Sequence, residues 1–267
     1  MTEEYRDLLF TIEGRVATIT LNRPEAYNAI SDPMRESLRA ALDRLRREDG
    51  VYIVIFTGAG KAFCAGGDVK LMRRRIEENI SYRDRLASYR ENVAGMVKEI
   101  RAIRQITVAQ VNGAAYGAGC SIAMLCDIRV AAAEAKFGLP FGRRGLVPDW
   151  GALYFLPRLV GASQAIALTA TGRGVEAARA RELGLVNEVV PAADLPGFVK
   201  AYCQDILLSS PLSLLESKAA IYEAMSAELD TALEREGRLQ SACFRSDDHR
   251  EGVDAFLEKR PPSFTGK

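Results

Sequence analysis

Two glycine-rich turns are the segments of this sequence best suited to chemistry. The first is Lys-Ala-Phe-Cys-Ala-Gly-Gly-Asp at residues 61–68, and the second is Asn-Gly-Ala-Ala-Tyr-Gly-Ala-Gly-Cys at 112–120. Each follows a short apolar segment, so the small residues could serve only to pack a strand against a helix start. They could also let a ligand reach the backbone N–H groups. Two converging N–H groups make an oxyanion hole, which stabilises negative charge on a carbonyl oxygen.

The residue types exclude several other kinds of site. Neither turn ends in the Gly-Lys-Ser/Thr of a phosphate loop or fits the dinucleotide pattern cleanly. His249 is the only histidine, in a polar run predicted to be a solvated helix start, so a multi-histidine metal site is impossible. The five cysteines are widely spread and contain no C-x-x-C pair. This spacing favours a reducing compartment over a disulfide framework or structural zinc.

Composition predicts a folded protein with a sizeable core. The chain has 267 residues, of which 48% are hydrophobic and 27% charged, with a formal net charge of +1. A nucleic-acid or membrane-surface binder usually shows a stronger basic bias, so neither partner is expected. We see no secretory signal and no apolar stretch of the roughly 18 residues that suggest a membrane span. We therefore expect a soluble cytoplasmic protein.

Alternating strands and helices must position the two turns. The sequence predicts a hairpin around Glu13-Gly14, then a helix with Asp32 as N-cap and Pro33 at its first position. Further predicted elements are a buried strand at 51–56, one or two helices in 70–103, a strand at 108–111, a helix through 122–125 and a strand at 127–131. Strand–helix–strand units that recur in this way favour an α/β core.

The last quarter of the chain has a different pattern. Prolines separate helical stretches at 192–208, 211–225, 228–246 and 248–258, and no strand pattern remains. We therefore predict two domains: a core over residues 1–195 that carries the site, and a helical region over 196–267. The helical region would pack on the core or on a neighbouring subunit.

Motifs along nearly the whole chain resemble the crotonase superfamily, the enoyl-CoA hydratase/isomerase family. In order, they are Leu21-Asn22-Arg23-Pro24 with Asn28-Ala29; Phe63-Cys64-Ala65-Gly66-Gly67-Asp68; Val111-Asn112-Gly113 with Gly117-Ala118-Gly119; Cys126-Asp127; Gly145-Leu146-Val147-Pro148; Leu156-Pro157-Arg158; Thr171-Gly172; Glu182-Leu183-Gly184-Leu185-Val186; and Glu251-Gly252 with Phe256-Leu257-Glu258-Lys259-Arg260. Their joint order and spacing are specific, although no single piece is decisive.

The resemblance implies a spiral core of repeated ββα units and C-terminal helices that form a homotrimer, often a dimer of trimers. It also implies an acyl-CoA thioester substrate, with no separate cofactor and no metal. The oxyanion-hole N–H groups map onto Gly67 and Ala118. The implied substrate contacts are Ala26, Ala65, Asp68, Val69, Lys70 and Lys259, where Lys259 would reach the CoA phosphates. Lys61, Lys70 and Lys259 could equally be ordinary surface lysines.

The sequence departs from the hydratase pattern at two positions. Hydratases of this family use two glutamates, and the register from Asn112-Gly113 puts Ser121 at the first of these positions. The register from Phe137 and Pro140 puts Phe141 at the second. Neither side chain can move a proton near neutral pH, so hydration by two glutamates is not expected. Ser121 and Phe141 remain candidate substrate contacts, as does Trp150.

Asp149 is the one carboxylate left at a family acid–base position. Isomerase branches of the family carry an acid there, as does the branch that dehalogenates aromatic thioesters. An apolar wall of Phe141, Leu146, Val147 and Trp150 would raise the pKa of Asp149, which suits a group that takes and returns a proton. Without the resemblance, Asp149 could simply be a helix N-cap.

These residues predict an enzyme that shifts a double bond in an enoyl-CoA, with Asp149 as the acid–base group. The variant Gly-Leu-Val-Pro-Asp-x-Gly also resembles isomerases of ring-modified aryl-acetyl-CoA substrates. Two alternatives stay open among enzymes: a hydratase or other crotonase reaction with Asp149 as sole acid–base group, or Asp149 as a nucleophile. A non-catalytic acyl-CoA-binding oligomer is a further alternative.

Overall fold

The computed structural model describes residues 2–267, which form two compact units. The first contains the residues up to Ile103 together with Thr107–Val199, and the second contains Arg104–Ile106 together with Lys200–Lys267. The sequence did not indicate that residues 104–106 join the C-terminal unit. No helix among residues 2–267 is long and apolar enough to cross a membrane.

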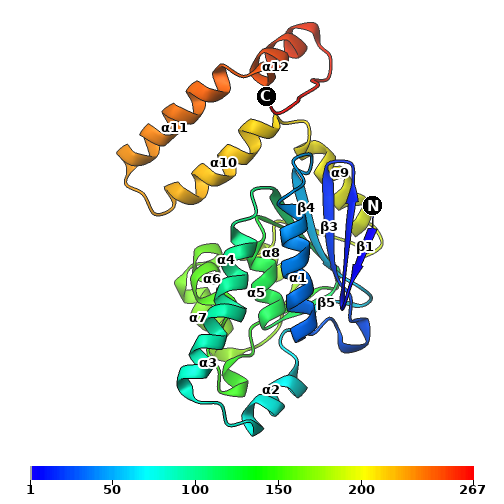
Figure 1. Cartoon of the computed structure of the whole chain (residues 1–267), viewed down its shortest axis with the longest axis vertical. Helices are drawn as coiled ribbons and strands as arrows, with labels where there is room; N and C mark the ends of the chain where they lie inside the picture. Colours follow the sequence, from blue (N-terminus) through cyan, green and yellow to red (C-terminus); the bar gives the residue numbers. More distant parts are fainter. Residues whose placement is uncertain (1) are drawn as a thin grey trace. The chain divides into compact units, whose positions relative to one another are not determined.

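A seven-stranded sheet forms the framework of the core (Figure 1). Its order is β1 (Thr2–Tyr5), β2 (Leu8–Glu13), β3 (Val16–Leu21), β4 (Ile53–Gly58), β6 (Ile106–Val111), β8 (Ile128–Ala132) and β11 (Glu188–Val190). The predicted hairpin is confirmed, because β2 and β3 pair antiparallel around Gly14. β3 and β4 pair parallel, as do β6 with β8 and β8 with β11. Strands β4 and β6 are almost wholly buried, as parallel strands covered on both faces usually are.

A second sheet of four short strands carries the chemistry-bearing turns. Its order is β10 (Val175–Glu176), β9 (Lys136–Gly138), β7 (Ala114–Tyr116) and β5 (Ala62–Cys64). β5, β7 and β9 run parallel. Their carboxyl ends therefore meet at one edge of the sheet, where residues 65–68 and 117–120 of the two glycine-rich turns and the segment 139–141 follow the strands.

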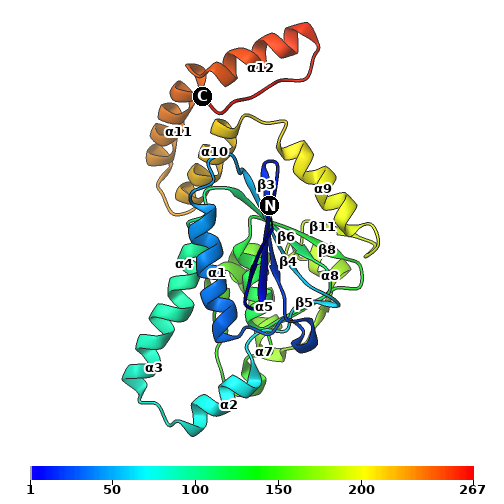
Figure 2. The same cartoon turned by 45° about the vertical axis from the view of Figure 1, so that its right-hand side comes forward.

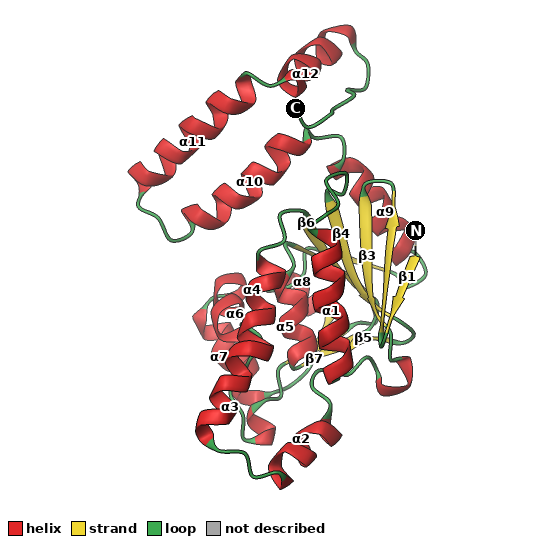
Figure 3. Ribbon diagram, in the orientation of Figure 1, coloured by secondary structure: helices red, strands yellow, loops and turns green. Residues whose placement is uncertain are grey.

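Helices cover the strands of the first unit (Figure 3). They are α1 (Asp32–Leu45), α2 (Val69–Glu77), α3 (Tyr82–Tyr89), α4 (Gly95–Arg101), α5 (Ala118–Leu125), α6 (Ala152–Val160), α7 (Ala162–Thr171) and α8 (Ala177–Glu182). A π-helical segment, Arg90–Ala94, joins α3 to α4. Both views place α1 beside α4 (Figures 1 and 2). The N-cap of α1 is Ser31 rather than the predicted Asp32, because the Ser31 hydroxyl accepts the Met34 N–H.

The predicted C-terminal helices are confirmed. They are α9 (Leu195–Ile206), α10 (Pro211–Ala224), α11 (Leu229–Phe244) and α12 (Asp247–Glu258). The boundary between the two compact units falls within α9, after Val199. His249 lies in the first turn of α12, where its N–H donates to the Ser246 N-cap. Within the second unit, Lys218 donates to the Gln105 carbonyl at 2.7 Å, which ties residues 104–106 to α10.

Helix α5 packs so closely on β5 that only glycine fits at position 119. All eight residues of α5 are buried. A Cβ atom on Gly119 would lie 2.1 Å from the Cys64 carbonyl oxygen and 2.7 Å from the Cys64 Cβ. Backbone therefore meets backbone at this contact, and no side-chain rotation can relieve an added methyl group.

We expect Gly119→Ala to destabilise the protein by about 1–3 kcal/mol or more, the cost of overpacking a rigid core. Gly197→Ala is the matched control, because a Cβ there has nothing within 4 Å. The control should change stability by less than about 1 kcal/mol. Urea denaturation of both variants checks this, and equal midpoints would contradict the tight contact.

Candidate active site

The two glycine-rich turns lie directly against each other. Gly66 has φ of +97°, and a Cβ atom there would lie 2.6 Å from the Tyr116 carbonyl oxygen and 3.3 Å from the Ala118 nitrogen. Gly117 also has a positive φ, +51°, and precedes the first residue of α5. Glycine at these two positions thus permits both the backbone turn and the close approach.

Gly67 and Ala118 line the same cavity, which has a volume of about 580 Å³. Ala118 is the first residue of α5, so its N–H has no acceptor within the helix. Gly67 follows Gly66, whose carbonyl accepts the Ile30 N–H at 2.8 Å. Residues of both turns thus line one cavity, and an oxyanion hole would require their N–H groups to converge there.

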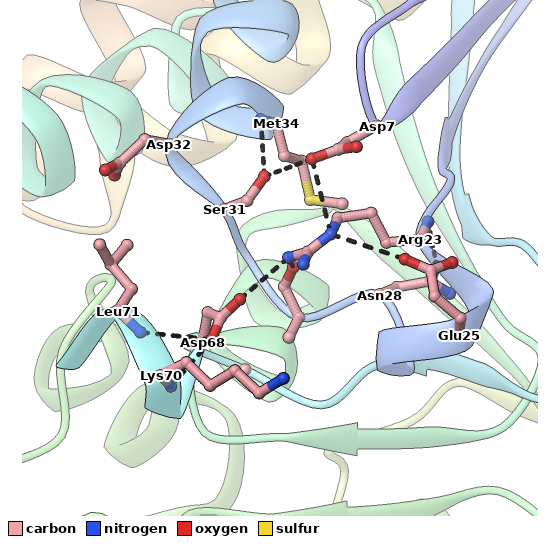
Figure 4. A network of polar contacts seen from close by, with 12 residues as sticks. Asp7, Arg23, Glu25, Asn28, Ser31, Asp32, Met34, Asp68, Lys70 and Leu71 are labelled. Atoms are coloured by element: carbon pink, nitrogen blue, oxygen red, sulfur yellow. Dashed lines mark hydrogen bonds and ion pairs between the residues drawn. The ribbon is translucent and has the colours of Figure 1, made fainter. Parts of the chain in front are cut away.

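A polar network fixes the first turn (Figure 4). The Asp68 carboxylate caps α2, accepting the N–H groups of Lys70 at 2.9 Å and Leu71 at 3.4 Å. Arg23 pairs with Asp68 at 3.2 Å and donates to the Ala29 carbonyl at 2.8 Å. Burial raises the pKa of Asp68, but the hydrogen bonds from Leu71, Arg23 and Lys70 outweigh it and hold that pKa below its usual range.

The same network reaches the start of α1. The Arg23 Nε lies 3.5 Å from the Asp7 carboxylate, which accepts the Ser31 hydroxyl at 2.6 Å. Ser31 is the N-cap of α1. Arg23 therefore connects the caps of α1 and α2, and through Asp68 it fixes the residue that follows Gly67.

Asp149 places a carboxyl group with one unpartnered oxygen on the cavity wall. Its Oδ1 is buried and, within residues 2–267, has no hydrogen-bond partner. Burial raises the pKa of Asp149 to about 6. The N-cap interpretation of Asp149 is wrong, because α6 begins after Gly151 and receives no side-chain cap.

The backbone beside Asp149 has an unusual conformation. Trp150 is buried and has φ of +52°, and Gly151 has φ of +78°. A positive φ is rare for a bulky residue and costs about 1–3 kcal/mol. This left-handed pair of residues separates Asp149 from the start of α6.

Apolar side chains form the wall around Asp149. Phe141 and Trp150 are buried, whereas Leu146 and Val147 are 44% and 72% exposed, and all four line the cavity. Residues of α2, α3 and the π-helical segment also line the cavity. Met72 lies over Gly67, since a Cβ on Gly67 would be 2.5 Å from its Cε.

The cysteines beside the turns are poor nucleophiles. Cys64 and Cys120 are buried, and burial raises the pKa of each thiol to about 12. Both thiols remain protonated at neutral pH, and neither lines the cavity.

The structure brings together most of the predicted site residues but not all of them. Those that line the cavity are Asp149, Gly67, Ala118, Ala65, Asp68, Val69, Phe141 and Trp150. Ser121 does not: it is fully buried, and its hydroxyl donates to the Gly117 carbonyl at 3.2 Å. Ala26 and Lys70 also lie outside the lining. Lys259, in the second unit, ends α12 as an exposed residue with φ of +55°.

Sequence reasoning missed the contribution of residues 69–93. The helices predicted within 70–103 include Ile76 and Ile80, but these side chains are 78% and 41% exposed, and no residue of α2 or α3 is buried. These helices line the cavity instead. The many charged residues of this segment were the available sign, because a helix pair packed in the core usually carries fewer of them.

Solved structures assign the fold to the crotonase class. The structure of an enoyl-CoA hydratase from Bacillus anthracis superposes with a TM-score of 0.90 at 31% identity, covering 98% of this chain and all of that one. The predicted α/β crotonase fold is thereby confirmed.

The sequence comparisons give the family. The chain matches the enoyl-CoA hydratase/isomerase family model over residues 11–267. It is 36% identical over 260 residues to the 1,2-epoxyphenylacetyl-CoA isomerase of Escherichia coli, covering 97% of this chain and 98% of the relative. It is 34% identical to the short-chain-enoyl-CoA hydratase of Clostridium acetobutylicum, covering 96% and 97%. The chain belongs to the enoyl-CoA hydratase/isomerase family and is an acyl-CoA enzyme of that type.

The raised pKa makes Asp149 a source of pH-dependent instability. A buried carboxyl with a folded pKa of about 6 and an ordinary value of 3.8 favours the folded state when protonated. Stability from this group is therefore greatest at low pH and is lost as pH rises from about 4 to about 6.

We expect Asp149→Asn to be more stable than the native protein at pH 7 and equal to it near pH 4. The gain at pH 7 should be about 1–3 kcal/mol, since a pKa difference of one corresponds to about 1.4 kcal/mol. Urea denaturation at both pH values measures it. A stability difference that does not change with pH would contradict the raised pKa.

Proposed function

We propose that this enzyme shifts the double bond of an enoyl-CoA, with Asp149 as its only acid–base group. The observation that carries the proposal is the buried, unpartnered Oδ1 of Asp149 in the cavity that Gly67 and Ala118 line. Ser121 and Phe141, at the two positions where hydratases of the family have glutamates, supply no second proton carrier.

The reaction needs two proton transfers and one oxyanion. The Asp149 carboxylate removes a proton from the α carbon of a 3-enoyl thioester, and the electron pair moves onto the thioester oxygen. The N–H groups of Gly67 and Ala118 stabilise the resulting dienolate. The Asp149 carboxylic acid then returns the proton to the γ carbon, which gives the conjugated 2-enoyl thioester and restores the carboxylate.

The environment of Asp149 suits a group that gives and takes a proton. A pKa of about 6 leaves the group mainly ionised at neutral pH, yet its conjugate acid remains strong enough to return the proton. The apolar wall of Phe141 and Trp150 keeps water away from the dienolate and so favours return of the proton over side reactions.

Hydration is the less favoured alternative. Adding water across the double bond is best served by two carboxylates, and the other carboxylate in the cavity is Asp68. Its capping bonds and its ion pair with Arg23 keep it ionised and occupied. A hydratase here would have to use Asp149 alone.

Isomerisation of a ring-modified aryl-acetyl thioester is a second candidate. The resemblance of the 145–151 segment to such isomerases favours it, as does the 36% identity to the 1,2-epoxyphenylacetyl-CoA isomerase. Asp149 and the oxyanion hole would keep the same roles. We also propose that Ala26, Lys70 and Lys259 contact the CoA portion, and that the enzyme is a homotrimer or a dimer of trimers.

A 3-enoyl-CoA incubated in heavy water should gain deuterium at the α or γ carbon as it becomes the conjugated thioester. Asp149→Asn should lower the rate by about two to four orders of magnitude, the usual contribution of a positioned acid–base group. Product analysis by mass spectrometry and NMR measures both effects.

Ser121→Ala is the matched control for this experiment and should cost far less, because Ser121 lies outside the cavity lining. Near-full activity of Asp149→Asn would refute the acid–base role. If Asp149→Asn still binds acyl-CoA, and neither it nor the native protein turns over any enoyl thioester, the result would instead support a non-catalytic binder.

The proposed oligomer follows from apolar side chains on the C-terminal helices. Leu208, Ile221, Leu233 and Phe244 are 61%, 61%, 52% and 67% exposed in the single chain. Such a set is unusual for a free surface and typical of an interface. We expect light scattering at micromolar concentration to give the mass of a trimer or hexamer, and a monomer mass would refute the assembly.

A further inference from the structure

The cavity wall formed by α3 and the π-helical segment is largely polar. Arg85, Ser88, Tyr89 and Asn92 line the cavity and recur at the three- and four-residue spacing of one helix face. The Asn92 amide donates to the Ser88 hydroxyl at 3.3 Å. A hydrocarbon tail packed on this face would remove these polar groups from water. It would offer them no hydrogen bonds in return, which is unfavourable. This wall is therefore poorly suited to a plain fatty acyl chain.

The polarity increases with distance from the catalytic carboxyl. At the inner end, a Cβ on Gly151 would lie 3.4 Å from Val97, so the segment holding Asp149 packs at that helix position. Val93 follows towards the outer end, then Tyr89, whose pKa is raised by burial and by the charge of Asp149. Arg85 lies a further four helical residues out, roughly 6 Å along the axis.

Arginines in the lining outnumber the carboxylates available to pair with them. Arg35, Arg75, Arg85 and Arg144 line the cavity. Arg35 and Arg75 both bind Asp32, Arg75 at 2.9 Å, so one carboxylate serves two guanidinium groups. Within residues 2–267, the side chains of Arg85 and Arg144 form no ion pair or hydrogen bond.

The acidic residues of the lining do not balance this charge. Asp68 is paired with Arg23, and Asp149 is the proposed acid–base group at the inner end. The cavity lining therefore carries excess positive charge, which favours an anionic group on the ligand.

We propose that the acyl group of the substrate ends in a carboxylate, which Arg85 and Arg144 of the cavity lining bind. The substrate class is then the mono-CoA thioesters of unsaturated dicarboxylic acids, an assignment that rests on the proposed function. The planar guanidinium binds a carboxylate through two parallel hydrogen bonds, which gives both affinity and orientation. The anionic oxygens could instead be those of the CoA phosphates, and the test separates the two sources.

Binding of saturated thioesters tests the proposal without any reaction. Suberyl-CoA and octanoyl-CoA have the same chain length and differ in a terminal carboxylate or methyl group, as do adipyl-CoA and hexanoyl-CoA. Calorimetry should show that the native enzyme binds at least one diacid thioester about tenfold or more tightly than its monoacid partner. In Arg85→Gln/Arg144→Gln this preference should disappear.

Arg83→Gln is the matched control, because Arg83 is an exposed arginine of the same helix outside the cavity lining. It should keep the preference, and free CoA should bind the native enzyme and the double variant equally. Monoacid thioesters that bind as tightly as the diacids would overturn the proposal. A double variant that loses affinity for free CoA by the same factor would also overturn it and assign the arginines to the phosphates. If the preference holds while no enoyl thioester is isomerised, only the proposed reaction fails.

Discussion

The backbone contact between the two glycine-rich turns is the constraint on which the rest of the site depends. β5 and β7 run parallel, so both turns begin at one edge of their sheet. They can meet only because residues 66 and 119 lack side chains, and the Cys64 and Tyr116 carbonyls occupy the space that a Cβ would need. The same contact brings Gly67 and the start of α5 to a single cavity. Packing and chemistry can therefore both explain these glycines, because the tight packing brings residues of both turns to one cavity.

The energetic cost of the site is concentrated around Asp149. Its carboxyl oxygen has no partner among the described residues, and the neighbouring Trp150 has a left-handed backbone conformation. Both features disfavour folding locally and persist because the surrounding apolar core is large enough to offset them. Asp68 shows the opposite case. It lies on the same cavity, but its hydrogen bonds and ion pair stabilise the fold and leave it little freedom to react. Two carboxyl groups on one cavity thus have different environments: Asp149 has an unpartnered oxygen and a raised pKa, whereas Asp68 is held by its partners.

Much of this architecture could be predicted from the sequence. Strands rich in apolar residues, such as 53–58 and 106–111, are almost wholly buried and are easily recognised. The motif order along the chain gave Gly67, Ala118 and Asp149, all of which line the cavity. The helix pair α2 and α3 could not be placed, because apolar spacing alone does not show whether a helix face meets the core or a cavity. Ser121 was assigned to the substrate by its register, but the register of a helix cannot tell whether a hydroxyl points outward or back to its own turn.

The absence of buried residues in α2 and α3 has a consequence for substrate access. Within the described part of the chain, α2 is held mainly by polar contacts at its ends: Asp68 and Arg23 at the start, and Asp32 with Arg75 near the end. Moving this helix exposes little apolar surface, so a transient opening of the cavity wall costs far less free energy than any disturbance of α5 or the sheets. An opening at α2 would therefore leave the close contact between the two glycine-rich turns undisturbed.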